Sequence, residues 1–279
     1  MTDRKLLHLT IASAALIAFA TFCAMGAYEF TASYRPTPPA HFVTYEGGAC
    51  DIAVISVVGS LFSSEALAKA QTASDHSAAV SAEHVLEELD RAAHDPSMKG
   101  VLLSINSGGG NGGDRIANAL RRFPKPNAAL ILTQGDSSAY EAASGAQVII
   151  ATPFSDVGDI GVTMSYVEKA GEEAQAGDRF VKLSAGKYKD AGNPDEPLSK
   201  DEQATLQQYV DREYELFVEE LARNRHMPIA RMQALSNGSS YLGADAVKNG
   251  LVDQLGDSET AREWFAKRIH APAVLCKPT

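Results

Sequence analysis

The sequence predicts an α/β domain with a mostly parallel sheet, and three observations support this fold class. Apolar runs at residues 52–58, 100–105 and 128–132 are typical of strands that are buried on both faces. Segments with helical periodicity lie between these runs, at Ser81 to Ala93 and at Asp114 to Phe123. Glycine, proline and other turn residues separate the segments. Strands that alternate with helices need crossover connections, so we expect neighbouring strands to run parallel.

Local signals define the elements of the first half. Residues 63–79, rich in serine, alanine and charge, are predicted as a loop or a loose helix. Ser81 is suited to cap the helix that follows it, because its hydroxyl can accept a hydrogen bond from an N–H group of the first turn. Asp95-Pro96 should end this helix, since proline cannot continue the hydrogen-bonding pattern.

The second half begins with predicted strands. Residues 148–152 are apolar and read as a strand, and residues 158–162 as a turn leading into another strand. Phe180 to Leu183 is predicted as a further short strand.

Helices dominate the remainder of the chain. Ser199 is expected to cap a long helix with apolar positions through Leu221, and Met227-Pro228 should end it. Two more helices are expected, one near Ala244 and one from Ala261 to Arg268.

The N-terminal region differs in composition from the rest. Residues 6–27 carry no charge, and about 22 residues of helix suffice to cross a hydrocarbon core of about 30 Å. Arg4 and Lys5 precede this stretch, which by the positive-inside rule keeps the N-terminus cytoplasmic. A cleaved signal peptide is the alternative, with Ala24-Met25-Gly26 as its cleavage site. The predicted divisions are a cytoplasmic N-terminus (1–5), a transmembrane anchor (6–27), a proline-rich linker (28–50) and the main domain (51–279).

Charge and cysteine content exclude several classes of function. The net charge of −10 and the lack of clustered lysine and arginine argue against nucleic-acid binding. Cys50 and Cys276 follow the predicted anchor, where a disulfide could persist, but two cysteines so far apart in sequence do not predict a pair. No cysteine and histidine have the spacing of zinc ligands, so no metal site and no cofactor are predicted.

The central stretch of the chain offers three candidate nucleophiles. The apolar run ending at Leu132 is followed by Gly135 and then by an alanine-rich helix that starts with serines. A hydroxyl on the first turn of a helix is presented at a strand end, where free N–H groups can stabilise negative charge. The candidates are Ser137, Ser138 and Ser144.

The glycine-rich loop from Gly108 to Gly113 admits two interpretations. It matches the dinucleotide-binding pattern G-x-G-x-x-G. Against this, Asn106-Ser107 separates it from the apolar strand, and the preceding hundred residues have no place in that fold. The alternative is that its backbone N–H groups stabilise an oxyanion, at about 3 kcal/mol per donor.

A serine nucleophile needs a base, and lysine fits this sequence better than histidine. The histidines of the main domain lie in predicted helices or near its ends, so a Ser-His-Asp triad finds little support. Lysine can act as the base when burial favours its neutral form. The polar loop at residues 184–190 supplies Lys187 and Lys189.

Five segments in order resemble the S49 family of signal peptide peptidases, which are membrane-anchored Ser-Lys proteases of the ClpP/crotonase fold. The resemblance covers about Asp51 to Leu255. The first three segments are the opening strand, the stretch from Lys99 into the glycine loop, and the serine segment 137–144. The fourth is the pair of motifs I-x-A-x-P and G-x-I-G at 149–162. The fifth is the lysine segment 186–194, followed by the closing helix and strand at 246–256.

The resemblance implies roles for individual residues. Ser137 corresponds to the nucleophile and Lys189 to the general base. The backbone N–H groups of Gly109 and Ser138 correspond to the oxyanion hole. Ser144 falls at a serine that is not catalytic in the family.

Two departures from the family pattern concern the same site. Gly108 replaces a proline, which makes the oxyanion loop more flexible. Asp159 replaces a serine that lies near the base lysine, and a carboxylate there would favour the charged form of the lysine, which cannot act as a base. Asp159 is therefore expected to modulate the base, and a weakened or inactive enzyme is the alternative prediction.

The prediction is thus a membrane-anchored serine endopeptidase with its catalytic domain on the periplasmic or extracytoplasmic side. The resemblance implies signal peptides or other short extended peptides as substrates, and a homo-oligomeric ring or dome in which serine and lysine meet across a subunit boundary. The rivals are a peptide-binding scaffold without activity and an acyl-CoA enzyme of the crotonase type; the predicted anchor and the lysine loop speak against the second rival.

Overall fold

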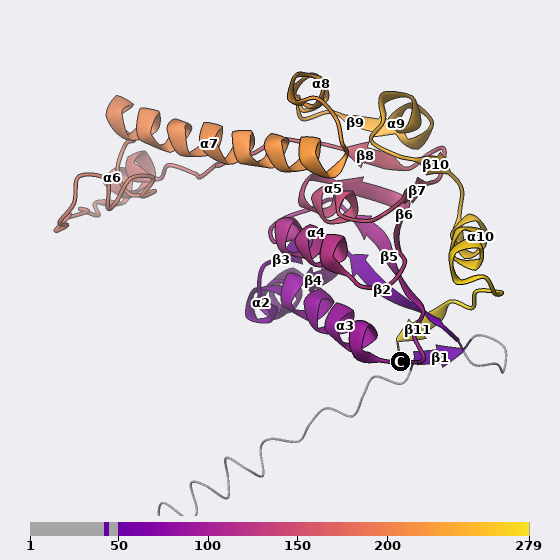
Figure 1. Ribbon diagram of the computed structural model, residues 1–279. Coiled ribbons are helices and arrows are strands. Elements are labelled where there is room, and N and C mark those ends of the chain that lie inside the picture. Colours follow the sequence, from indigo (N-terminus) through magenta and orange to yellow (C-terminus); the bar gives the residue numbers. More distant parts are fainter. Residues whose placement is uncertain (1–41, 45–49, 279) are drawn as a thin grey trace, which may run out of the picture. The chain divides into compact units, whose positions relative to one another are not determined.

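The computed structural model describes residues 42–44 and 50–278 (Figure 1). None of the helices in this part is both long enough and apolar enough to cross a membrane. The predicted anchor at residues 6–27, and most of the predicted linker, lie outside the described residues. Phe42–Thr44 is a strand, β1, which pairs antiparallel with β11 (Cys276–Pro278).

The centre of the domain is a seven-stranded sheet, and the predicted α/β class with mostly parallel strands is confirmed. Its main path runs in the order β10-β7-β6-β5-β2, with every neighbouring pair parallel, and β8 pairs with β6 and with β9. The strands are β2 (Ile52–Val58), β5 (Gly100–Ser107), β6 (Asn127–Asp136), β7 (Ile149–Ala151), β8 (Asp156–Gly158), β9 (Ser240–Leu242) and β10 (Gln254–Leu255). A smaller parallel sheet joins β3 (Ser60–Phe62) and β4 (Ala79–Ser81).

The helices cover both faces of the sheet, as Figure 1 shows, with α3, α4 and α5 on one face and α10 on the other. The bounds are α2 (Glu65–Asp75), α3 (Ala82–His94), α4 (Gly113–Arg122), α5 (Ser137–Ser144), α6 (Ala170–Ala176), α7 (Lys200–Asn224), α8 (Ile229–Leu235), α9 (Gly243–Asn249) and α10 (Ser258–Ile269).

The apolar runs of the sequence form strands because both of their faces are covered. In β6, Ala129 and Ile131 pack into the core under α3, α4 and α5, whereas Ala128 and Leu130 pack on the opposite side. That second core includes Trp264 and Phe265 of α10. Continuous apolar sequence is what a parallel strand between two helix layers requires.

Two helix starts confirm capping predictions. The Ser81 hydroxyl accepts a hydrogen bond from the His84 N–H at 3.0 Å at the start of α3. Ser199 and Glu202 form a complete capping box at the start of α7. Residues 63–79, predicted as a loop or loose helix, contain α2 with Ser64 as its cap. Helix α8 was not predicted, since its seven residues are too few to show a clear period.

Two strand predictions are wrong. Phe180 to Leu183 has no regular structure, and Leu183 is 95% exposed. In the described part of the chain no strand pairs with this segment, and an apolar segment without a pairing partner cannot form a ladder. Residues 158–162 do not lead into a strand either. The strand at that point, β8, comes before the turn, and the chain continues without regular structure from Asp159 to Lys169.

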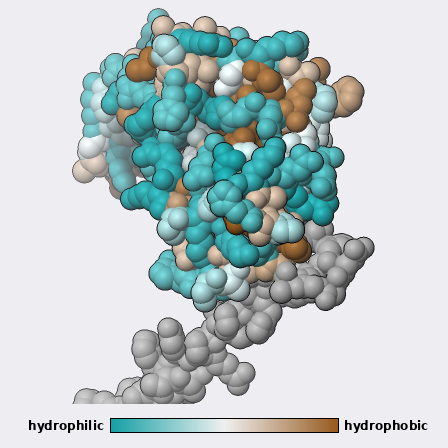
Figure 2. Space-filling model, turned by 45° about the vertical axis from the view of Figure 1, so that its right-hand side comes forward, coloured by the Kyte–Doolittle hydropathy of each residue, from teal (hydrophilic) through white to brown (hydrophobic). Residues whose placement is uncertain are grey.

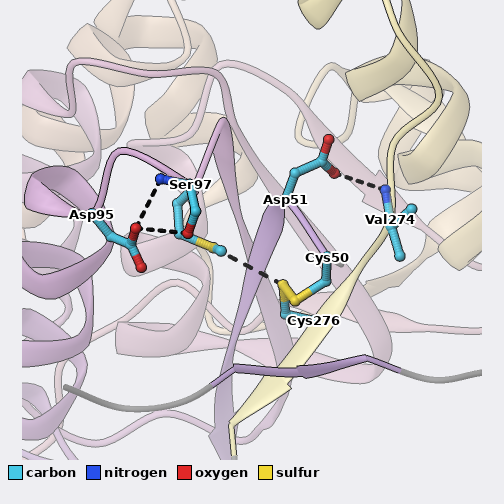
Figure 3. Close-up of a disulfide and its surroundings, with 7 residues drawn as sticks. Cys50, Asp51, Asp95, Ser97, Val274 and Cys276 are labelled. Atoms are coloured by element: carbon cyan, nitrogen blue, oxygen red, sulfur yellow. Dashed lines mark hydrogen bonds between the residues drawn. A yellow bond between two sulfur atoms is a disulfide. The ribbon is translucent and has the colours of Figure 1, made fainter. Parts of the chain in front are cut away.

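A disulfide closes the domain near its two ends (Figure 3). Cys50, just before β2, is bonded to Cys276 in β11, across 226 residues of sequence. Beside it, the Asp51 carboxylate accepts a hydrogen bond from the Val274 N–H at 2.8 Å. The pairing could not be read from the sequence, because it depends on β11 returning alongside β2.

One face of the domain is largely hydrophilic, with apolar residues gathered mainly in its upper part in Figure 2. Away from the sheet, residues 164–211 form a segment that we call the arm. It comprises most of the irregular stretch after β8, the helix α6, the lysine loop and the first half of α7 (Figure 1). The buried residues of α7 are Val218, Leu221 and Ala222, all beyond the arm.

Candidate active site

Ser137 lies where the central strand ends and a helix begins. It is the first residue of α5 and directly follows β6. Its φ is +51°, a left-handed conformation that costs a residue other than glycine about 1–3 kcal/mol unless the surroundings stabilise it. The side chain is partly exposed, so its hydroxyl is accessible. Strain of this kind is concentrated at functional sites, and it singles out Ser137 among the three candidate serines.

The other two candidate serines have structural hydrogen bonds. The Ser138 hydroxyl is buried and accepts the Gly113 N–H at 2.8 Å, which ties α5 to the start of α4. The Ser144 hydroxyl donates to the Glu141 carbonyl and accepts from the Asn224 side chain at 2.9 Å. Both hydroxyls therefore hold helices together.

The glycine loop passes close to Ser137. A Cβ on Gly109 would lie 2.7 Å from Ser137 Cβ and 3.0 Å from the Ser138 nitrogen. Gly109 has φ +96° and Gly110 has φ +139°, so this approach depends on glycine. The loop is held on its other side by β3, where the Leu61 N–H donates to the Gly109 carbonyl at 2.9 Å.

The predicted oxyanion donors thus flank Ser137, and one of them already has a partner. The Gly109 N–H donates to the buried Ser107 hydroxyl at 3.1 Å. Ser138 is the second residue of α5, so its N–H is among the four that a helix leaves without a partner in the helix itself. Sequence reasoning missed Ser107, although its place two residues before Gly109 was visible.

Asp136 fixes the strand end just before Ser137. Its carboxylate is buried and accepts hydrogen bonds from the Gln134 amide at 2.8 Å and from the Ser240 hydroxyl at 3.1 Å. Burial raises the pKa of Asp136, and the two hydrogen bonds oppose that rise. The carboxylate links β6 to β9, which helps to hold Ser137 in its strained conformation.

A cavity of about 890 Å³ opens beside Ser137. Its walls come from the glycine loop, from the first turns of α4 and α5, from Asp159 and the residues after it, and from the middle of α7. It is large enough for several residues of a peptide. Within residues 42–44 and 50–278 no cluster of histidine, cysteine, aspartate and glutamate is arranged to hold a metal ion.

Glu141 is the most perturbed acid in this cavity. It lies one helical turn after Ser137 on α5, and its mostly buried carboxylate packs against the start of α4. Burial, together with the nearby carboxylates of Glu220 and Asp114, raises the pKa of Glu141 to about 8. Sequence reasoning missed this residue, and its spacing of four from Ser137 was the available signal.

Lys189 does not reach Ser137 within one chain. Its loop is fastened to the first turn of α7, where Asp201 pairs with Lys187 at 2.5 Å and accepts the Tyr188 hydroxyl at 3.0 Å. The cavity of Ser137 is lined by Leu216 of the same helix, about 22 Å further along its axis. Lys189 is exposed and does not line that cavity.

Lys187, the other lysine of the loop, is held as a cation. The hydrogen bond between Lys187 and Asp201 raises the pKa of Lys187, which is the wrong direction for a base.

Asp159 lines the same cavity as Ser137. It has φ +44°, and its N–H donates to the Ser239 carbonyl at 3.1 Å. No ion pair of Asp159 occurs in the part of the chain that the structure describes, so an effect on Lys189 would require another subunit.

Comparison with known proteins identifies the family. The model of "Peptidase family S49" matches residues 119–271, more than half of the chain. The chain belongs to peptidase family S49. The match includes Ser137, Lys189 and α7, whereas the glycine loop lies before it.

Individual relatives agree with this family. The chain is 35% identical to "Putative protease MJ0651" of Methanocaldococcus jannaschii over 64% of this chain and 59% of that protein. It is 32% identical to "Putative signal peptide peptidase SppA" of Enterococcus faecium over 66% of this chain and 55% of that protein. With "Protease 4" of Haemophilus influenzae the identity is 27% over 75% of this chain and 33% of that protein. The matches thus span between about a third and three fifths of these relatives.

Proposed function

We propose that this S49 protein is a membrane-anchored serine endopeptidase whose nucleophile is Ser137 and whose general base is Lys189 of an adjoining subunit. The observation that carries the proposal is the strained Ser137 at the junction of β6 and α5, next to Gly109 and at the wall of a large cavity. Membership of a peptidase family and the protease names of the relatives support it.

The arm supports the assignment of the base to a second subunit. It carries Lys189 away from the cavity of its own chain, and it exposes large apolar side chains. Val167 is 72% exposed, Val181 65% and Leu183 95%. Apolar groups gathered on a projecting segment mark a contact surface. A homo-oligomeric ring or dome would cover them and bring each lysine loop to a neighbour's serine.

The mechanism uses the chain's own groups. The neutral amine of Lys189 takes the proton of the Ser137 hydroxyl, and Ser137 Oγ attacks the carbonyl carbon of the scissile bond. The N–H groups of Gly109 and Ser138 stabilise the oxyanion. The intermediate collapses, and the leaving amine receives the proton from the Lys189 ammonium. Water, deprotonated by the same amine, then hydrolyses the acyl ester and releases Ser137.

The oxyanion step requires a change of partner at Gly109. Its N–H group donates to the Ser107 hydroxyl in the described state. A charged acceptor forms a hydrogen bond roughly twice as strong as a neutral one, so the developing oxyanion would outcompete the hydroxyl. Ser107 would thus satisfy the donor while the site holds no substrate.

The proposed substrates are signal peptides or other short extended peptides, and the proposed location of the catalytic domain is the periplasmic or extracytoplasmic side of the cell membrane. The name of the Enterococcus faecium relative supports the substrate class. The predicted anchor at residues 6–27 supports the location, and so does the Cys50–Cys276 disulfide, because such bonds persist in oxidising compartments.

Covalent labelling with a fluorophosphonate tests the nucleophile. We expect the full-length chain to be labelled and Ser137→Ala to be unlabelled, because the probe reacts with an activated serine. Ser144→Ala is the matched control, since it removes a hydroxyl from the same helix, and we expect it to retain labelling. Labelling that persists in Ser137→Ala would refute the assignment.

Mixing two inactive variants tests the shared site. Ser137→Ala keeps Lys189, and Lys189→Met keeps Ser137, so only a site formed between subunits can combine intact groups. At equal amounts, about a quarter of the boundaries in a ring hold both groups, and we expect about that fraction of wild-type peptidase activity. If both groups came from one chain, the mixture would stay inactive.

The second candidate function is a scaffold that binds peptides without cleaving them. The position of Asp159 in the cavity favours it, because a carboxylate near the base would stabilise the ammonium form of lysine. This candidate predicts that peptides bind to the full-length chain while Ser137 remains unlabelled. Asp159→Ser would then be expected to restore labelling.

A further inference from the structure

The cavity beside Ser137 has a strong excess of negative charge. Acidic side chains line it from the start of α4, from α5 and from the middle of α7, whereas the single basic residue of its lining is Arg223. Arg223 lies 3.8 Å from Glu220 and is mostly exposed, so it compensates one carboxylate at the rim. The acids are Asp114, Glu141, Asp159, Glu213, Glu219 and Glu220.

Glu141 occupies a fixed position within this lining. It follows Ser137 by four residues, so the two side chains lie on the same face of α5. Glu141 Oε2 would be 2.9 Å from a Cβ on Gly113, which places the carboxyl group against the start of α4. The Asp114 backbone lies near the same carboxyl group and partly opposes the rise in its pKa. The group is therefore held in place before any substrate arrives, within the cavity that contains the nucleophile.

The surroundings of Glu141 lack a cation. Burial and the neighbouring carboxylates of Glu220 and Asp114 raise the pKa of Glu141 to about 8, which means that its charged form is poorly stabilised. Among the described residues it forms no ion pair. A cation entering the cavity would stabilise this carboxylate and relieve the repulsion among its neighbours.

The same cavity has an apolar side. Leu216, which is 50% exposed, and the half-buried Phe217 project from α7 into the lining. A lysine or arginine side chain combines an apolar stem with a charged end, and such side chains bury the stem on apolar surface while the end meets polar groups. An apolar wall next to carboxylates suits a side chain of this kind.

We infer that the cavity beside Ser137 is a specificity pocket for a basic side chain of the peptide substrate, with Glu141 as its specificity-determining residue. The inference rests on the proposed function, because it assigns the substrate class of the same site. The stem of the lysine or arginine lies along Leu216 and Phe217, and its cationic end meets Glu141 and Glu213. Acidic peptides are repelled by the same lining.

Peptide cleavage by the full-length chain tests the inference. The substrates are heptapeptides of alanine with lysine, norleucine or glutamate at the centre, of which norleucine keeps the stem of lysine without its charge. A charge-assisted contact corresponds to about a tenfold preference, so we expect kcat/KM to be about tenfold higher for lysine than for norleucine, and lowest for glutamate. We expect Glu141→Gln to bring the lysine to norleucine ratio close to one.

Matched variants separate a local from a general charge effect. Glu215→Gln removes an acid from α7 outside the cavity, and we expect it to keep the wild-type ratio. Glu213→Gln removes an exposed acid of the cavity, and we expect an intermediate ratio. Equal kcat/KM for lysine and norleucine in the wild type, or a ratio that Glu141→Gln leaves unchanged, would overturn the inference.

Binding to Ser137→Ala gives a readout that does not depend on catalysis. The same peptides, labelled with fluorescein, are titrated and their dissociation constants measured by anisotropy. We expect lysine to bind about tenfold more tightly than norleucine, and this difference to vanish in the Ser137→Ala and Glu141→Gln double variant. Absent labelling and cleavage would refute the proposed function alone, whereas binding without charge preference would refute the pocket.

Discussion

The surroundings of Ser137 and the arm differ in almost every physical respect. Around Ser137, buried strand ends, the Asp136 hydrogen bonds and the close approach of Gly109 define one geometry. The arm is irregular outside its two helical parts, and it has exposed apolar side chains and a lysine loop held by exposed contacts to Asp201. One chain thus brings the proposed nucleophile and the proposed oxyanion loop together by itself, whereas in the proposed mechanism Lys189 requires a second subunit.

The largest effect is expected from the two lysines of the arm. Lys189→Met should lower kcat by about 10⁴-fold or more, as loss of a general base does for a serine nucleophile. Lys187→Met should keep most of the activity, because Asp201 holds Lys187 as a cation. Peptidase rates of both variants measure the difference. Equal losses of activity in the two variants would mean that both substitutions disturb the conformation of the loop, and Lys189 would then not be distinguished as the base.

A smaller effect is expected from the glycine loop. Gly109→Ala would bring a Cβ to 2.8 Å from the Asp136 carbonyl and 2.7 Å from Ser137 Cβ, and its φ is +96°. We expect kcat to fall by about 10²–10³-fold, as for the loss of an oxyanion donor.

Gly108→Ala is the control for Gly109→Ala. Its Cβ would meet only the flexible Gln134 side chain, at 3.4 Å or more, so activity should change little. Similar losses in the two variants would show that the loop is less rigidly placed than its contacts indicate.

The disulfide should affect stability without affecting chemistry. Replacing Cys50 and Cys276 together by serine removes a bond across 226 residues, and we expect the free energy of unfolding to fall by about 2–4 kcal/mol. The rate of fluorophosphonate labelling at a temperature where the variant is folded should stay unchanged. Denaturant unfolding and labelling kinetics measure the two quantities. A large fall in labelling would mean that Ser137 depends on the closure of the domain.

The smallest effect concerns pH. Because the pKa of Glu141 is raised to about 8, the folded state holds a proton that the unfolded state loses near pH 4.5. Stability from this group is complete below pH 4.5, declines as the pH rises, and has gone above pH 8. The full change in pKa corresponds to about 5 kcal/mol, and because solvent reaches the partly exposed carboxyl group we expect about 3 kcal/mol or less. The free energy of unfolding of the wild type and of Glu141→Gln is measured from pH 5 to 8.5, and the difference between the two should be smallest at pH 5. A difference that does not change with pH would contradict the raised pKa of Glu141.

Much of the fold was predictable because its signals are local. Continuous apolar strands, the Ser81 cap and the Ser199 capping box all follow from residues close in sequence. The strand predicted at Phe180 to Leu183 failed because apolar composition does not reveal whether a pairing partner exists. The anchor at residues 6–27 stays a prediction, because these residues lie outside the part of the chain that the structure describes.

The site was predictable in its residue types and less so in its contacts. Ser137, Gly109 and Ser138 were placed together from order and motif, and they lie together in the structure. The hydrogen bond of Ser107 to Gly109, the burial of Asp136 and the raised pKa of Glu141 could not be read from the sequence. These properties depend on distances between segments that only the packed sheet defines.

By itself, the order of residues determined the central strands, most of the helices, the family and the serine on which the proposed chemistry depends. Only the tertiary structure decided that Cys50 meets Cys276, that carboxylates line the cavity beside Ser137, and that the loop of Lys189 is fastened to the opposite end of α7 from that cavity. The physical reason is the separation in sequence over which each kind of interaction acts. Capping, periodicity and turn chemistry act over a few residues, whereas cavities and electrostatic fields arise between segments that the fold brings together.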